Sequence, residues 1–400
     1  MSTLKVDNIR HNSATSDAIT MASDGTCSAK LSSVNDGQFS HRNMIINGGM
    51  MISQRGSSVA ITGGSNTVPL IDRYMAVANS GMTYNVTISQ EADNPFGLGK
   101  SFKSLTTSAK TPSGSENYII RTKLEEQDIT RIGFGTSGCK KTTLTFWVKS
   151  NKTGTYSVMV AINSFDINLL TSYTINAQNT WEKKTISIPE YTTSYTHPAD
   201  NGSGFTVDWH LSSGPDDLVS AHSWQTSASN ARAVTGQVNL LDTVGNYWQL
   251  ANVQYEVGEV STPFEHRSFA DELRRCQRYY YQVGGQTNDG SPDNSYGVIL
   301  PMAMCASATR VKGILHHPVN MRTGPTLSGG GSGTCAIQQG DNTPNSTLVY
   351  QNGWSGSNTT RYSWVDLSPN SGTVSNVGET GIVYAYNSTY HIKVSAEFTF

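Results

Sequence analysis

Alternation of apolar and polar residues constrains the fold of this chain more than any other feature. Leu144, Phe146 and Val148 share one parity, and residues 156–162 repeat the pattern. A period of two places such side chains on one face of a half-buried strand. Further runs of this kind, separated by Asn-Gly, Gly-Gly and Ser-Gly turn signals, lie at 84–89, 117–122, 183–188, 205–209 and 247–257. The pattern predicts an all-β chain in which residues 43–267 form a jelly-roll-like β-sandwich.

The strand pattern resumes after residue 281, at 296–304, 381–386 and 390–400. In the last run every second residue from Tyr390 to Phe400 is apolar, which indicates a buried strand rather than a free tail. Two turn-rich tracts, 326–347 and 351–364, are expected to be long loops. Residues 282–400 are therefore predicted to form a second, distal β domain.

A short segment between these two domains changes period. Ser268 fits a helix N-cap, and Phe269, Leu273 and Cys276 recur at helical spacing. Acidic residues occupy the first turn and arginines the last, which suits the helix dipole. The sequence predicts a connector helix at 268–281 that packs its apolar face into the seam between the domains.

The first 42 residues contain runs that are too short to bury a face of their own. They form either a loose terminus or an attachment and oligomerisation segment that becomes ordered against other copies of the chain or a host surface. On the second interpretation, the apolar residues that self-association would cover are Leu4, Val6, Ile9, Ile19 and Met21.

Composition excludes several classes of partner. A net charge of −2 and a pI near 6.5 provide no basic field for nucleic acid or an anionic membrane. No apolar run approaches the roughly 20 residues that span a bilayer, and the first residues are too polar for a signal peptide. The five cysteines are odd in number and widely spaced, so free thiols are expected. The chain is expected to be made and assembled in a cytoplasm, without membrane insertion.

No motif indicates catalysis, a metal or a cofactor. A nucleophile elbow is absent, and the Gly-rich run at 329–333 lacks the lysine and helix of a phosphate loop. The run 289–293 has alternate calcium-type ligands but no closing Glu, which favours a surface turn. The carboxylates that a glycosidase could pair are scattered through polar tracts, at Asp200, Asp208, Asp216 and Asp217. The sequence therefore predicts no enzyme, no metal and no cofactor.

Aromatic residues within polar tracts are the remaining candidates for binding. Sugar rings combine apolar C–H faces with polar rims, so exposed aromatic planes near amides and hydroxyls suit them. The candidate glycan-binding residues are Trp354, Tyr350, Tyr362, Trp364, His222 and Trp224. The same rings could instead anchor loops onto a sheet. If a receptor is bound, contact is expected at the distal loops around Trp354.

Three segments together resemble a known module. They read NMIINGGMMISQRG at 43–56, LIDRYMAV at 70–77, and WQLANVQYEVGEVSTPFEHRSFADELRRCQRYY at 248–280. In order and spacing they are similar to a recurrent module of bacteriophage tail fibres and related virion appendages, whose sandwich is like that of carbohydrate-binding modules. The tract at 318–327 resembles a segment of the family's second domain. Related modules often hold calcium through an acidic residue after the first Asn-Gly, but Gly49 and Met50 stand there in this chain.

The resemblance implies a structural subunit of a phage tail fibre or virion appendage, located in the virion and contacting host-surface polysaccharide. It further implies a homotrimer and contacts with other virion proteins through the N-terminus. The alternatives are a depolymerase-like, carbohydrate-active virion enzyme and a lectin outside any virus.

Overall fold

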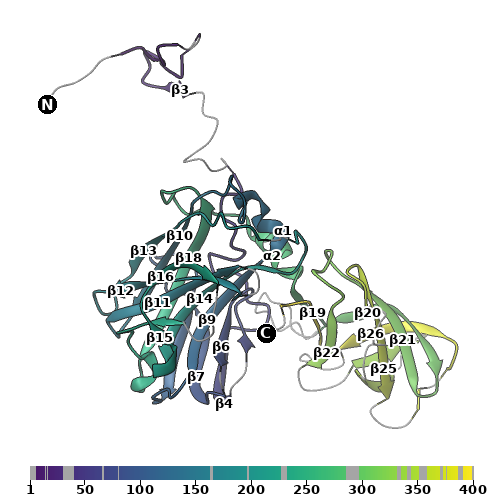
Figure 1. Ribbon diagram of the computed structural model, residues 1–400. Coiled ribbons are helices and arrows are strands. Elements are labelled where there is room, and N and C mark those ends of the chain that lie inside the picture. Colours follow the sequence, from purple (N-terminus) through teal and green to yellow (C-terminus); the bar gives the residue numbers. More distant parts are fainter. Residues whose placement is uncertain are drawn as a thin grey trace.

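The strands expected from the alternating pattern form an all-β structure with two short α-helices in its described part, seen in a computed structural model (Figure 1). The structure describes the chain except for residues 1–5, 14, 16, 30–39, 65–66, 80, 163–164, 196–197, 227–231, 285–296, 331–334, 340–343, 351–357, 370–372, 375, 386–390 and 399–400. A small N-terminal sheet, a sandwich and a barrel follow one another along the chain.

Two antiparallel sheets make up the sandwich. The first has the order β13-β10-β18-β8-β7-β4, and the second has the order β16-β12-β11-β14-β9-β6-β5. The strands of the first sheet are β4 (Ser58–Gly64), β7 (Tyr84–Glu91), β8 (Ser101–Ser108), β10 (Thr142–Ser150), β13 (Glu182–Ile188) and β18 (Tyr247–Val257). Those of the second are β5 (Val68–Pro69), β6 (Met75–Asn79), β9 (Asn117–Glu125), β11 (Gly154–Ile162), β12 (Ile167–Ile175), β14 (Ser203–Ser213) and β16 (His222–Thr226). The predicted jelly-roll-like sandwich is confirmed.

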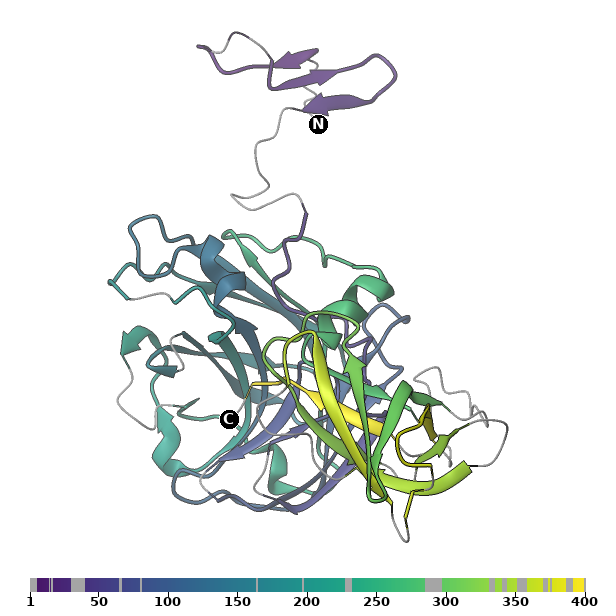
Figure 2. The same cartoon turned by 90° about the vertical axis from the view of Figure 1, so that its right-hand side faces the viewer.

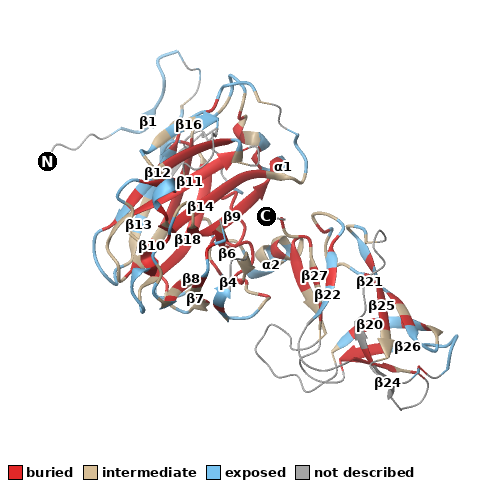
Figure 3. Ribbon diagram, turned by 60° about the horizontal axis from the view of Figure 1, so that its bottom comes forward, coloured by how far each residue is buried: buried red, intermediate tan, exposed pale blue. Residues whose placement is uncertain are grey.

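The core of the sandwich lies between these sheets, as the buried strands in Figure 3 show. Phe205 of β14 stacks on Tyr255 of β18 with ring centroids 4.3 Å apart, so the two sheets are joined through aromatic rings. Trp209 and Trp248 are fully buried in the same core. Short elements complete this part of the chain: α1 (Glu126–Ile129), η1 (Thr130–Ile132), η3 (Pro215–Asp217), β15 (Leu218–Val219), β17 (Ala233–Val234) and η4 (Leu240–Asp242).

A buried ion pair links the two central strands of the second sheet. Arg121 of β9 lies opposite Asp208 of β14, and its Nε and Nη2 each donate to one carboxylate oxygen at 2.7 Å. Both side chains are almost completely removed from solvent. This bidentate geometry gives each oxygen of the buried carboxylate a hydrogen bond that water cannot provide there.

The connector helix α2 (Phe269–Gln277) begins where the sequence predicts, but it ends before the predicted end at 281, because Tyr280 and Tyr281 lie in strand β19 (Tyr280–Val283). Ser268 accepts a hydrogen bond from the Asp271 N–H at 3.2 Å, as an N-cap should. Cys276 is fully buried in a small cluster with Ile46, Ile52, Tyr279 and Phe398, against which Leu273 packs. Phe269, however, is 60% exposed, so the expectation that it faces the seam is wrong. It lies in the first turn, outside the cluster.

We expect Leu273→Asp to lower the free energy of unfolding by about 2 kcal/mol, because it places a charge beside an apolar cluster. Phe269→Asp, in the same helix but exposed, should change stability by no more than about 0.5 kcal/mol. Urea denaturation of both variants checks this. Equal stability of the two variants would contradict the packing of Leu273.

The distal domain begins directly after the helix. Six strands close into a barrel in the order β20-β21-β25-β24-β23-β26, and three more form a sheet in the order β19-β27-β22. Their bounds are β19 (Tyr280–Val283), β20 (Val298–Ser307), β21 (Arg310–His316), β22 (Thr326–Gly330), β23 (Cys335–Gln338), β24 (Pro344–Tyr350), β25 (Tyr362–Pro369), β26 (Thr380–Ala385) and β27 (His391–Ser395). In the described part of the C-terminal run, Ile392, Val394, Ala396 and Phe398 are buried, as predicted, but the strand itself ends at Ser395.

The expectation of a long loop at 326–347 is wrong. This tract carries β22, which pairs with β27, and β23, which pairs with β26 and with the start of β24. The alternation of apolar and polar residues is hard to see in this tract because most of its residues are Gly, Ser or other polar types. Its few apolar residues, among them Leu327, Cys335 and Ile337, are nevertheless buried. The tract 351–364 also ends in a strand, because β25 begins at Tyr362.

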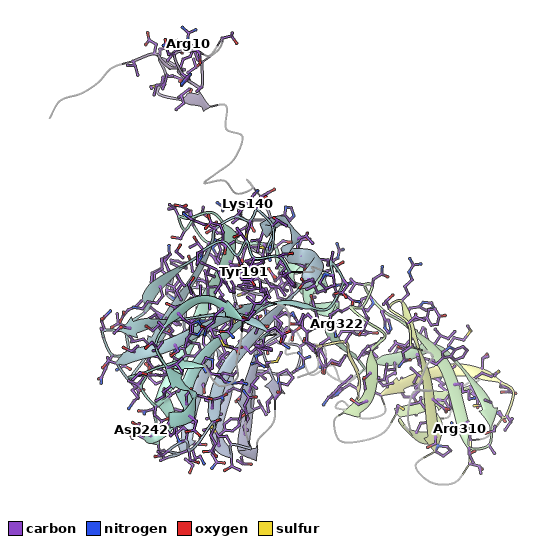
Figure 4. All side chains as sticks on the ribbon, in the orientation of Figure 1. Arg10, Lys140, Tyr191, Asp242, Arg310 and Arg322 are labelled. Atoms are coloured by element: carbon purple, nitrogen blue, oxygen red, sulfur yellow. The ribbon has the colours of Figure 1, made fainter. Side chains whose placement is uncertain are left out.

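The side chain of Arg322 joins the sandwich to the distal domain. Arg322, labelled in Figure 4 between the two domains, donates from Nε and Nη2 to the carbonyl oxygens of Ala396 and Glu397 at 2.7 and 2.9 Å. Its Nη1 donates to the carbonyl of Asn201, in a sandwich loop, at 3.0 Å. The guanidinium also lies 4.3 Å from the ring centroid of Phe398. One side chain therefore connects three stretches of backbone.

The N-terminal sheet consists of β1 (Asn8–Ile9), β2 (Ile19–Met21) and β3 (Cys27–Ala29) and stands apart from the sandwich in both Figure 1 and Figure 2. Of the five predicted oligomerisation residues, Leu4 lies outside the described residues. Val6, Ile9 and Met21 are 36, 47 and 39% exposed, and Ile19 is half-buried. One copy of the chain leaves these apolar side chains uncovered, and self-association stays a prediction.

Candidate functional site

A groove of about 350 Å³ lies at the end of the sandwich next to α2. Its walls come from the turn within the first motif, the loop between β7 and β8, the bulge of β18 and the segment that leads into the helix. The side chains that line the groove include those of Met51, Asn94, Phe96, Leu98, Asn252, Phe264, Phe269 and Glu272. Two of the segments that carry the tail-fibre resemblance, 43–56 and 248–280, therefore meet here.

The rim of this groove is apolar and exposed. Met51, Phe96 and Phe269 are 44, 57 and 60% exposed, and Leu98 is 87% exposed. Phe96 is held in place by an edge contact with Trp147, at 5.5 Å between ring centroids. Large apolar side chains scattered singly on a surface need no explanation, but four around one groove indicate a binding surface.

The loop that presents Phe96 and Leu98 is shaped by Asn94. Its Oδ1 accepts from the N–H of Phe96 at 3.1 Å, and its Nδ2 donates to the carbonyl of Lys100 at 3.0 Å. Gly99 has φ +119°, and a Cβ there would lie 3.1 Å from Nδ2 of Asn94. The loop is thus fixed in the conformation that exposes its two apolar side chains.

The floor of the groove contains a buried polar group. The register between β10 and β18 shifts at Phe146, so Asn252 and Val253 both lie opposite that residue in a β-bulge. Asn252 has φ +49° and is only 4% exposed. Its Nδ2 has no hydrogen-bond acceptor within the described part of the chain. A buried amide donor without a partner costs roughly 1–3 kcal/mol. Nδ2 is itself closed off from solvent, so an acceptor oxygen of a ligand recovers this cost only when the Asn252 side chain turns outward.

Charged residues on the groove wall are committed to structural contacts. Glu272 Oε1 accepts from the N–H of Asn47 at 2.5 Å and lies 3.4 Å from Nη1 of Arg267. Burial pushes the pKa of Glu265 upward, but hydrogen bonds from the backbone N–H groups of Asn43 and Arg42 outweigh it and hold the pKa below its usual value. These carboxylates are occupied in closing the fold, so the groove offers a ligand mainly the Asn252 amide and the apolar rim.

The four predicted glycan-binding residues whose side chains the structure describes lie in two different strands, two in the barrel and two in the sandwich. Tyr362 and Trp364 alternate along β25 and are 37 and 41% exposed on the outside of the barrel, so they are strand rather than loop residues. Trp354 and the side chain of Tyr350 lie outside the described residues. Their role in binding stays a prediction.

His222 and Trp224 also lie in a strand, β16 of the sandwich. The indole N–H of Trp224 donates to the carbonyl of Pro189 at 2.8 Å, and its ring makes edge contacts with Phe134 and Tyr191. The ring of Trp224 thus anchors this edge of the sandwich, as the alternative interpretation proposed. His222 Nδ1 is 2.9 Å from the carbonyl oxygen of Ser223.

Three of the four carboxylates that a glycosidase could pair have other partners, and the fourth, Asp216, is exposed. Asp208 binds Arg121, and Asp217 accepts from Nδ2 of Asn117 at 2.7 Å. Asp200 accepts from the N–H of Gly202 at 2.7 Å. Within the described ranges, no group of three or more His, Cys, Asp or Glu residues could hold a metal ion, and no helix is long and apolar enough to cross a membrane.

The sequence did contain a signal for the groove. Phe96 and Leu98 alternate with Gly97 and Gly99 after a proline, in a stretch that cannot be a buried strand. Large apolar residues in such a loop either plug the core or face solvent, and here they face solvent. Asn252 gave no signal, because its bulge interrupts a run that otherwise alternates normally.

Comparisons with known proteins found structural similarity only. No protein-family model and no curated protein matches the sequence. One similar solved structure is the enzymatically active domain of tailspike protein 4 of bacteriophage CBA120, 13% identical over 54% of this chain and 21% of that one, with a TM-score of 0.30.

Two others are carbohydrate-binding domains. The family 11 carbohydrate-binding module of Lic26A-Cel5E from Clostridium thermocellum is 11% identical over 53% of this chain and 98% of that one, with a TM-score of 0.26. The CBM22-1 xylan-binding domain of Xyn10C from Paenibacillus barcinonensis is 10% identical over 52% and 100%, with a TM-score of 0.22. Similarities this weak carry no argument about what this chain binds.

Proposed function

We propose that the chain is a non-enzymatic structural subunit of a phage tail fibre or virion appendage that binds host-surface glycan in the groove beside α2. The observation that carries the binding proposal is the buried, unpartnered amide of Asn252 beneath a rim of exposed Phe and aliphatic side chains. Sugars match this combination, since their C–H faces pack on aromatic rings while their hydroxyl and ring oxygens accept hydrogen bonds.

The virion half of the proposal rests on the motifs at 43–56, 70–77 and 248–280. Asn43 of the first motif donates from Nδ2 to the carbonyl of Val253 and accepts at Oδ1 from the N–H of Tyr255, both in the third. The uncovered apolar side chains of the N-terminal sheet suit attachment to other virion proteins and a homotrimer. Mass spectrometry of purified virions tests this half; a lectin outside any virus would be absent from them.

The expected absence of catalysis can be tested separately. A depolymerase needs an acid and a base or nucleophile across a cleft, and the wall carboxylates Glu265 and Glu272 are bound to backbone N–H groups instead. Incubation with host polysaccharide should release no reducing ends. Steady release would favour the alternative of a carbohydrate-active virion enzyme.

Glycan binding is expected to depend on the groove. On an array of bacterial surface polysaccharides, Phe96→Ala should weaken binding about tenfold, equivalent to about 1.4 kcal/mol of lost contact. Asn252→Gly, which tolerates the positive φ but lacks the amide, should weaken it similarly. The matched control is Trp364→Ala, which removes another exposed aromatic ring, on the barrel. If Trp364→Ala abolishes binding and the groove variants do not, the predicted distal surface binds the glycan and the groove proposal fails.

A further inference from the structure

A second cavity, of about 610 Å³, adjoins the groove. The two share Glu265, His266 and Arg267 as a common wall. The remaining lining comes from Ser40 and His41, from the first and last turns of α2, and from Val319 and Asn320 of the distal domain. A ligand longer than one sugar ring could therefore occupy both cavities.

The second cavity is rich in arginine, and two of its arginines are already occupied. Arg278 binds Glu125 through Nε and Nη2, at 2.6 and 2.7 Å. Arg267 donates to the carbonyl groups of Ile45 and Asn43. These two guanidinium groups fasten the helix and the segment before it to the sandwich.

Two arginines of α2, Arg274 and Arg275, are free to bind. Neither side chain makes a hydrogen bond or ion pair with any residue that the structure describes, and Arg274 is exposed. The acids of the same wall are engaged, since Asp271 accepts from Ser268 Oγ at 2.7 Å and Glu265 holds two backbone N–H groups. Desolvation raises the pKa of Asp128 above its usual value, and the nearby positive charges of Arg278 and Arg275 oppose this rise.

We propose that the glycan is acidic: its anionic sugar binds Arg274 and Arg275, and a neighbouring ring packs on the Phe rim of the groove. This inference rests on the proposed function and adds the chemical class of the ligand. Side chains one residue apart on a helix diverge, but Arg274 and Arg275 both line the second cavity. A carboxylate placed there can therefore accept charge-assisted hydrogen bonds from both guanidinium groups. In a chain with a net charge of −2, two unpaired arginines beside an apolar groove favour a carboxylate-bearing polysaccharide over nucleic acid.

The test compares two ligands on the full-length protein by calorimetry. One is an oligogalacturonate, and the other is the same oligomer after its carboxyl groups are reduced to alcohols. The wild type should bind the acidic oligomer at least tenfold more tightly, and this preference should shrink as NaCl rises from 50 to 500 mM. Arg274→Gln/Arg275→Gln should abolish the preference.

The control double variant, Lys183→Gln/Arg361→Gln, removes the same charge from two exposed residues elsewhere and should keep the preference. Thermal melting of both variants verifies that they fold. Equal binding of the two oligomers by the wild type, no binding of the acidic one, or an unchanged preference in the arginine variant overturns the inference. If the two oligomers bind equally and Phe96→Ala weakens the binding of both, the inference about an acidic ligand fails but the proposed glycan site in the groove stands. If Phe96→Ala changes the binding of neither oligomer, the proposed glycan site fails as well.

Discussion

Arg121→Met is expected to lower the free energy of unfolding of the sandwich by about 3–5 kcal/mol. The variant leaves the Asp208 carboxylate buried in the second sheet without the guanidinium that satisfies both of its oxygens. An uncompensated buried charge is among the most costly single defects in a folded protein. Urea denaturation followed by tryptophan fluorescence measures the loss, since Trp209 lies next to Asp208 along β14.

The double variant Arg121→Met/Asp208→Leu separates the loss of the pair from the effect of a stranded charge. Replacing both partners by apolar residues of similar size removes the charge and should restore most of the stability. Were the double variant as unstable as Arg121→Met alone, the stranded charge would not be the cause.

The contribution of the Asp72 side chain to the free energy of unfolding should increase as the pH falls from 7 to 4. Burial raises the pKa of this carboxyl from 3.8 to about 6, against the opposing charge of Arg55. The folded state then binds a proton in a range where the unfolded state does not, so the stabilisation is complete below about pH 4 and is lost as the pH rises through 6. The expected size is roughly 3 kcal/mol.

The readout is the stability of the wild type minus that of Asp72→Asn across this range. Asn does not titrate, and it also loses a contact with the Gln54 amide at every pH. The free energy of unfolding of the wild type minus that of Asp72→Asn should therefore increase as the pH falls. The same difference for Asp216→Asn, at an exposed position, should not change with pH in this way. A flat difference for Asp72→Asn would mean that the carboxyl stays ionised in the folded protein.

Local sequence patterns predicted most strands and the helix. The runs at 117–122, 156–162 and 247–257 lie within β9, β11 and β18, and Ser268 caps α2. These elements are set by side-chain period and by one hydrogen bond at a helix end, both of which act over a few residues. The barrel closure was not predictable, because it depends on pairing between strands far apart in the chain, such as β20 with β26.

The candidate site was harder to predict than the fold. Its rim comes from loops whose exposure depends on what packs beneath them, as with Phe96 on Trp147. One of its lining residues, Asn252, lies in a bulge, and a bulge is an exception to the period on which the strand prediction relies. By contrast, the aromatic pattern that drew attention to Trp224 identified a ring that packs against Phe134 and Tyr191.

The chain enters and leaves the distal domain at the same joint, and this has a mechanical consequence. β19 at the entry pairs with β27 near the exit, and the N–H of Ala396 donates to the carbonyl of Tyr279. A sideways load on the far end of the barrel is carried by two strands and by Arg322 in parallel, with one strand pulled while the other is compressed. The barrel should behave as a stiff cantilever, so that a push on its far end is transmitted to the sandwich instead of bending the joint.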